Sequence, residues 1–156
     1  MKLRYNQAEA DLCEFLSRFS IVDTFSKKER WQWERRFRLT HLQTENPRRG
    51  RRPIGELHVE FGDYRTRALD FGDAEAEYRT LDNADEHRYI VLPEVPATIG
   101  FDCRGQLPTM EDWQSIANDS GLPFGIVVVD FELCWLFGMT ADWPGLGAYF
   151  AWGADS

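Results

Sequence analysis

Two stretches of the chain place their hydrophobic residues at helical spacing. The first predicts an amphipathic helix over residues 7–19, because its apolar positions recur every three or four residues: Ala8, Leu12, Phe15, Leu16 and Phe19. The tetrapeptide that runs from Asn6 to Glu9 has the form of a capping box, so this helix is expected to begin there. The second stretch follows Thr109 as its N-cap and ends near Gly121, with one apolar face formed by Met110, Trp113, Ile116 and Ala117.

Residues 26–42 support two interpretations. Ser26 and Glu29 form a second capping box, which favours a helix. Downstream, however, large apolar residues alternate with polar ones, as in a half-buried strand: Trp31, Trp33, Phe37 and Leu39. We favour a short helical turn that gives way to a strand, although the sequence alone leaves the choice open.

Several shorter segments have the character of strands. Residues 57–61, 64–70, 89–92 and 98–102 are expected strands, whereas 73–81 is either a short helix or a loop. Residues 125–130 and 133–139 are separated by too few residues for a crossover helix, so this pair is expected to be antiparallel. Residues 147–152 would add a final edge strand. The sequence therefore predicts an α+β fold, with an antiparallel β-sheet packed with two or three α-helices in a single globular domain spanning residues 1–156.

Charge is distributed unevenly along the chain. The net charge is −8, yet residues 27–52 carry ten Lys or Arg against three Glu, which gives +7 there and leaves −15 for the remainder. Such a division indicates either that two faces of the molecule pair with each other or that an external partner is bound.

The compartment is expected to be the cytoplasm. The N-terminus lacks the apolar stretch of a signal peptide, and the longest unbroken apolar run, residues 133–137, is far too short to cross a membrane. Three widely spaced cysteines, Cys13, Cys103 and Cys134, are typical of a reducing compartment. We expect no membrane association.

No motif demands catalysis, a cofactor or a metal. His58 and Glu60 have the spacing of a zinc-deaminase His-x-Glu, but no Pro-Cys-x-x-Cys follows, so a solvated pair on a strand is favoured. Cys134 lies in an apolar run and is expected to be an inert, buried thiol. The enzyme alternative is a small enzyme with a noncontiguous site, built from carboxylates and the histidines His41, His58 and His87.

A cluster of four arginines offers a nucleic-acid hypothesis. Basic groups near aromatic rings bind single strands by neutralising phosphates and stacking bases. Here the guanidinium groups of an expected loop lie close in sequence to Trp31 and Trp33: Arg48, Arg49, Arg51 and Arg52. The acidity of the rest of the chain opposes this use. The favoured interpretation is a solvated basic loop that pairs with the acidic surface.

The C-terminal third combines carboxylates with large rings. Aromatic residues are enriched at protein interfaces, and surrounding acids steer a basic partner. Trp113 and Trp135 are expected in the core, so the predicted partner-binding residues are Asp130, Glu132, Asp142, Trp143 and Trp152. The leading hypothesis is a non-catalytic protein-binding or inhibitor domain with a basic partner. In general character, though in no specific motif, the chain resembles the immunity proteins that neutralise bacterial toxins, many of which are acidic single domains.

Overall fold

The computed structural model describes residues 2–41, 68–81, 86–93, 99–120, 125–139 and 148–152. Within those ranges, the side chains of residues 2–6, 34, 37–41, 68–72, 117–120 and 148–152 are not described. The elements in chain order are α1 (Lys2–Ser17), β1 (Ser20–Phe25), α2 (Lys27–His41), β2 (Ala68–Asp70), α4 (Phe71–Arg79), β3 (His87–Pro93), β4 (Gly100–Gly105), α5 (Met110–Ser120), β5 (Ile126–Asp130), β6 (Trp135–Met139) and β7 (Ala148–Trp152).

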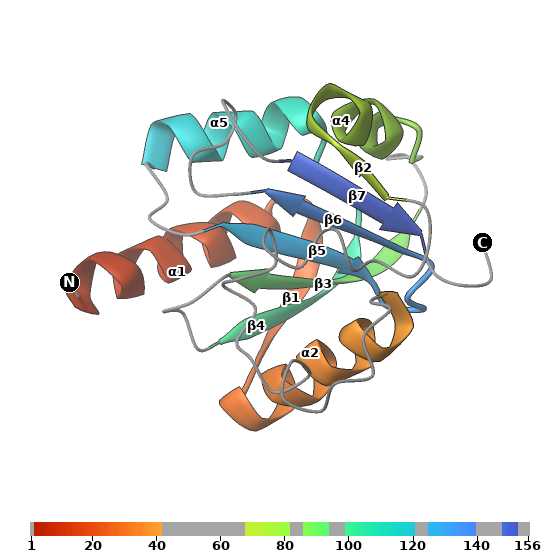
Figure 1. Ribbon diagram of the computed structural model, residues 1–156. Coiled ribbons are helices and arrows are strands. Elements are labelled where there is room, and N and C mark those ends of the chain that lie inside the picture. Colours follow the sequence, from red (N-terminus) through yellow and green to blue (C-terminus); the bar gives the residue numbers. More distant parts are fainter. Residues whose placement is uncertain are drawn as a thin grey trace.

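The strands form one antiparallel sheet in the order β1-β4-β3-β5-β6-β7-β2. Helices α1, α4 and α5 pack on one face of this sheet, whereas α2 lies on the other (Figure 1). The predicted α+β fold is therefore confirmed.

Alternation along the strands supplies both hydrophobic layers. On β3, Tyr89 and Val91 join the layer beneath α1, α4 and α5, while Ile90 and Leu92 join the layer beneath α2. Successive strand residues point to opposite faces, so a sheet covered on both sides needs an unbroken apolar run. The run Ile126-Val127-Val128-Val129 on β5 meets this need, and all four side chains are buried.

The preferred interpretation of residues 26–42 is wrong, because α2 is helical throughout. Arg30 and Trp33, three residues apart, face the sheet: Arg30 is buried, and Trp33 packs against the layer that contains Phe25 and Ile90. Trp31, which the strand interpretation would bury with Trp33, is instead 42% exposed. Packing against the sheet therefore favours the helix that the capping box at Ser26 and Glu29 indicated. The box is present in the structure, where the Glu29 amide nitrogen lies 3.3 Å from Ser26 Oγ.

The other helix predictions were correct in kind, but the predicted start of α1 was wrong. Helix α1 begins at Lys2, so the box of residues 6–9 lies inside it and is not its cap. The N-cap at Thr109 is confirmed: the Asp112 amide donates to Thr109 Oγ1 over 3.1 Å, and the Thr109 amide donates to Asp112 Oδ2 over 2.9 Å. The acidic segment 73–81 proves to be helical in α4.

Most predicted strands that fall on described residues are present. β3, β5 and β6 lie where expected, and β5 pairs with β6 in antiparallel register. The strand expected at 98–102 starts and ends slightly later, as β4. β7 is present but is no edge strand, because it lies between β6 and β2. β1 was not anticipated. The strand predicted at residues 57–61 and most of that at 64–70 lie outside the described residues.

Candidate functional site

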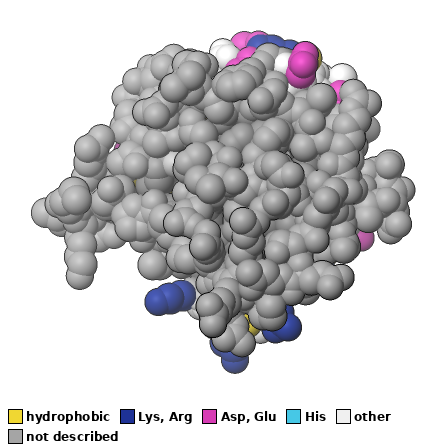
Figure 2. All heavy atoms as spheres, viewed as in Figure 1, with side chains coloured by type: hydrophobic (Ala, Val, Ile, Leu, Met, Phe, Trp, Pro, Cys, Tyr) yellow, Lys and Arg dark blue, Asp and Glu magenta, His cyan; other side chains and the backbone are white. Residues whose placement is uncertain are grey.

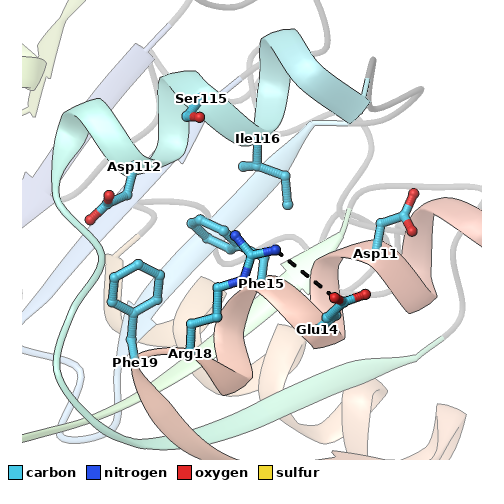
Figure 3. A pocket seen from close by; sticks show the side chains of 8 residues that line it. All are labelled: Asp11, Glu14, Phe15, Arg18, Phe19, Asp112, Ser115 and Ile116. Atoms are coloured by element: carbon cyan, nitrogen blue, oxygen red, sulfur yellow. Dashed lines mark ion pairs between the residues drawn. The ribbon is translucent and has the colours of Figure 1, made fainter.

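A groove with a volume of about 410 Å³ separates α1 from α5 (Figure 3). Its lining combines an apolar floor with a rim of charged and polar side chains: Asp11, Glu14, Phe15, Arg18, Phe19, Asp112, Ser115 and Ile116. We call this feature the acidic groove. It was not among the sites expected from the sequence.

Helix α1 supplies one wall of the acidic groove, because its apolar and polar residues lie on different faces of the helix. Leu12 and Leu16 are buried against the sheet, which turns Asp11, Glu14 and Arg18 toward solvent on the side facing α5. Gln7 donates a hydrogen bond from Nε2 to Asp11 Oδ1 over 2.9 Å, one turn earlier on the same helix. This bond holds the Asp11 carboxylate at the rim.

Helix α5 supplies the opposite wall, and its start is fixed by the reciprocal bonds between Thr109 and Asp112. Trp113 and Ile116 point into the core from α5, while Asp112 and Ser115 line the rim (Figure 3). A carboxylate in the first turn of a helix is favoured by the helix dipole. Asp112 therefore both caps α5 and gives the acidic groove a negative charge.

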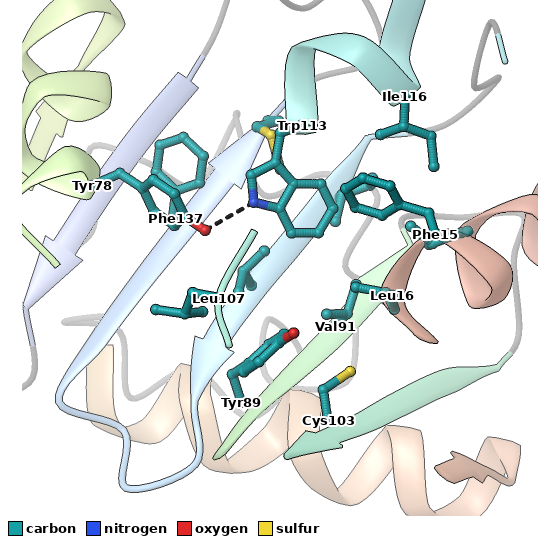
Figure 4. Packing of buried hydrophobic residues seen from close by; sticks show 14 of the residues in the cluster. Phe15, Leu16, Tyr78, Tyr89, Val91, Cys103, Leu107, Trp113, Ile116 and Phe137 are labelled. Atoms are coloured by element: carbon teal, nitrogen blue, oxygen red, sulfur yellow. Dashed lines mark hydrogen bonds between the residues drawn. The ribbon is translucent and has the colours of Figure 1, made fainter. Parts of the chain in front are cut away.

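The aromatic rings at and beneath the floor of the groove pack against one another. Phe15 lies 5.2 Å from the Phe19 ring and 5.2 Å from the Trp113 ring, centroid to centroid. Trp113 is held in turn by its Nε1 hydrogen, donated to Tyr78 Oη over 2.8 Å (Figure 4), and Tyr78 donates to the Pro108 carbonyl over 2.6 Å. The floor is thus tied to α4 and to the segment that precedes α5.

The electrostatics of the rim favour a cation. Three carboxylates, Asp11, Glu14 and Asp112, face a single guanidinium, that of Arg18. The pairing of Arg18 with Glu14 is loose, at 3.9 Å, and the two side chains are 68% and 76% exposed. Exposed pairs of this kind contribute at most about 1 kcal/mol. An incoming cation can therefore displace Arg18 from Glu14 at little cost.

The predicted partner-binding residues divide into three groups. Asp130 and Glu132 lie at the β5–β6 turn, and the backbone of Trp152 stands opposite Trp135, at the same end of the sheet. Asp142 and Trp143 lie outside the described residues, and the Trp152 side chain is not described. Trp113 and Trp135 are buried, as expected.

Asp130 has a structural role that the sequence did not reveal. Its carboxylate accepts a hydrogen bond from the Cys134 amide over 3.1 Å, and its carbonyl accepts one from the Leu133 amide over 2.8 Å. These bonds close the turn, in which Leu133 adopts a φ of 62°. Glu132 is exposed at the same turn. The expectation that Cys134 is buried is wrong, because β6 begins only at Trp135 and leaves Cys134 exposed.

A second charged feature beside this turn was also missed. Arg88 on β3 binds Asp102 on β4 through two contacts, at 3.2 Å from Nε and 2.8 Å from Nη2, and its guanidinium lies 3.6 Å from the centre of the Phe131 ring. The hydrogen-bonded Asp102 carboxylate raises the pKa of Arg88. Only the register of β3 against β4 brings these residues together, so nothing local in the sequence could have indicated the pair.

The basic loop and most of the predicted histidine site lie outside the described residues. The residues concerned are Arg48, Arg49, Arg51, Arg52, His58 and Glu60, and the side chain of His41 is also not described. His87 is half-buried on β3. In the part of the chain that the structure describes, no group of three or more His, Cys, Asp or Glu side chains is arranged to hold a metal ion.

Among the described helices, none combines the length and apolar character needed to span a bilayer. No protein-family model matches the chain, and comparisons with curated proteins and with solved structures give no significant match.

Proposed function

We propose that this protein is a non-catalytic binding domain that captures a basic partner protein through the acidic groove. The observation that carries the proposal is the arrangement of Asp11, Glu14 and Asp112 around an apolar floor. Lysine and arginine side chains combine an apolar stem with a cationic head, so they match both the apolar floor and the acidic rim of the groove. The stem packs on Phe15 and Ile116, and the head reaches the carboxylates.

The proposed partner is a basic protein, as predicted from the sequence, but its main binding site is the acidic groove and not the C-terminal third. Asp130 is already engaged in closing its own turn. The groove carboxylates are positioned by bonds within α1 and at the start of α5, and their remaining acceptor capacity faces solvent. Glu132, Asp142, Trp143 and Trp152 remain proposed contacts of the partner.

An inhibitor of the immunity type is the form that we propose for this function. A bacterial toxin that acts on nucleic acid needs a cationic cleft, and an acidic protein surface competes for that cleft by electrostatic complementarity. The proposed compartment is the cytoplasm. The three cysteines of the chain form no disulfide with one another, which fits a reducing environment.

Affinity capture with matched baits tests the proposal. The groove bait carries Asp11→Asn, Glu14→Gln and Asp112→Asn, which preserve shape while removing charge. The control bait carries Glu75→Gln and Glu77→Gln on α4, which do not line the groove. We expect one basic protein to be recovered by the wild-type and control baits, to be lost from the groove bait, and to be released by salt. Equal recovery by all three baits would contradict the proposal.

A further inference from the structure

The outer face of α2 carries three cationic side chains next to the exposed indole of Trp31. Lys27 and Lys28 precede Trp31 by four and three residues, and Arg35 follows it by four, so these side chains lie on the side of the helix away from the sheet. The buried Arg30 and the half-buried Trp33 occupy the other side. All four side chains are exposed, Trp31 at 42%. Figure 2 shows dark-blue side chains at the bottom of the view, where α2 lies in Figure 1. We call these four residues the basic stripe.

Among the residues that the structure describes, no ion pair includes a cation of the basic stripe. The ion pairs seen among the described residues join Arg18 to Glu14, Arg79 to Glu111 and Arg88 to Asp102. The Arg35 guanidinium lies 5.7 Å from the centre of the Trp31 ring. Within the described part of the molecule, the positive charge of the basic stripe therefore faces solvent.

We infer that the basic stripe binds single-stranded nucleic acid, a second activity that does not depend on the acidic groove. At a rise of about 1.5 Å per residue, Lys27 and Arg35 lie about 12 Å apart along the helix, with Trp31 midway. Cations on both sides of an exposed indole fit a strand whose phosphates contact Lys and Arg while a base stacks on the ring. A duplex keeps its bases stacked internally, and an acidic peptide has no base to offer the indole.

The net negative charge of the chain does not prevent this binding. Acidic side chains at the top of the view in Figure 2 lie over α4, and the sheet separates α4 from α2 (Figure 1). With about 10 Å for each packed layer, the two surfaces lie roughly 20 Å apart. The Debye length is about 8 Å at physiological salt, so each surface presents its own sign of charge to a ligand.

Fluorescence anisotropy with a labelled oligothymidylate of about 12 nucleotides tests the inference, with a duplex of equal length and polyglutamate as competitors. We expect the single strand to bind most tightly, with a slope of log K against log salt of about −2 for three phosphate contacts. Trp31→Ala should weaken binding about tenfold. Lys28→Gln should reduce the steepness of the slope by about 0.7.

Arg18→Gln and Arg79→Gln serve as controls, since both residues lie on the opposite side of the sheet, and neither should change oligonucleotide binding. Trp31 is exposed, so Trp31→Ala should keep the circular dichroism of the wild type. Equal affinity for duplex and single strand, unchanged binding by Trp31→Ala, stronger binding of polyglutamate or no oligonucleotide binding at all would each overturn the inference. None of these results bears on the acidic groove, for which a different ligand is proposed.

Discussion

At the residue scale, Gly105 shows how a single position holds the groove floor in place. Its φ is +153°, and a Cβ at this position would approach the Phe19 carbonyl oxygen to 2.6 Å and the Ser20 Cα to 2.8 Å. The next residue, Gln106, donates its amide hydrogen to that same Phe19 carbonyl over 3.0 Å. Close approach of two backbones is what glycine permits. The end of β4 therefore anchors the segment that carries Phe19 into the acidic groove.

Gly105→Ala should destabilise the fold by about 2 kcal/mol or more, because two backbone atoms would have to move and the φ disfavours a side chain. Urea unfolding followed by circular dichroism measures the loss. Gln106→Ala is the matched control: its side chain is exposed, so the change should stay within about 0.5 kcal/mol. Equal stability of the two variants would contradict this account of the β4 end.

Three buried ionisable side chains predict an alkaline limit to stability. Burial raises the pKa of Tyr78, Tyr89 and Cys103 well above their ordinary values. In the unfolded chain these groups ionise near pH 9 to 10, whereas the folded state keeps them neutral. The folded state therefore retains protons that the unfolded state releases. Their contribution is fully present below about pH 8 and is lost progressively as the pH rises above the ordinary pKa values toward the raised ones.

Above pH 10, the free energy of unfolding should fall by up to about 1.4 kcal/mol per pH unit for each of these groups. Urea unfolding at a series of pH values measures it, and Tyr78→Phe should make the decline shallower. Tyrosinate absorbance provides a direct check: at least two of the five tyrosines should titrate only on unfolding. Titration of all five near pH 10 in the folded protein would contradict the prediction.

At the scale of elements, Arg30 attaches α2 to the sheet. The side chain is only 4% exposed and donates from Nη1 to the Ile99 carbonyl over 2.7 Å and from Nη2 to the Pro93 carbonyl. These carbonyls lie at the end of β3 and just before β4. One guanidinium thus joins the helix that carries the basic stripe to two adjacent strands.

Arg30→Met should cost about 2–3 kcal/mol, because it removes charge-assisted bonds to two carbonyl groups. Arg35→Met changes the same residue type on the exposed face of the same helix, and it should cost less than about 0.5 kcal/mol. The two midpoints in urea supply the comparison. If Arg35→Met proved as costly as Arg30→Met, α2 would not be attached in this way.

Helices and strands were predicted correctly where the nearby sequence has a clear cap or hydrophobic pattern, and they were missed where it does not. α5 and β5 were recognised because Thr109 marks the start of one and an unbroken β-branched run marks the other. α2 was misread because alternate tryptophans resemble a half-buried strand; the choice depended on the burial of Arg30, which is polar and gives no hydrophobic signal. β1 was missed since its residues alternate weakly and Ile21 is exposed.

At the scale of the whole molecule, the sequence showed that positive and negative charges are concentrated in different parts of the chain. It did not show where the acidic groove lies. The excess of cations in residues 27–52 was evident, and its described part lies on the sheet face opposite the acidic groove. The groove itself requires Asp11 and Glu14 to face Asp112 from another helix, about a hundred positions away. Such a site depends on how two helices pack against one sheet, which no local pattern specifies.

The acidic groove is tested most directly by changing its charge in both directions. The probe is a short capped peptide that alternates arginine with leucine, and its control replaces each arginine by the neutral isostere citrulline. Titration into isotopically labelled protein reports which amide resonances move and gives the affinity.

We predict shifts at the residues that line the groove, about tenfold weaker binding by Glu14→Gln and severalfold tighter binding by Arg18→Gln, because the latter removes the competing cation. General damage to the fold cannot produce opposite effects from neighbouring positions. Equal affinity for the citrulline peptide, or shifts confined to other surfaces, would contradict the account.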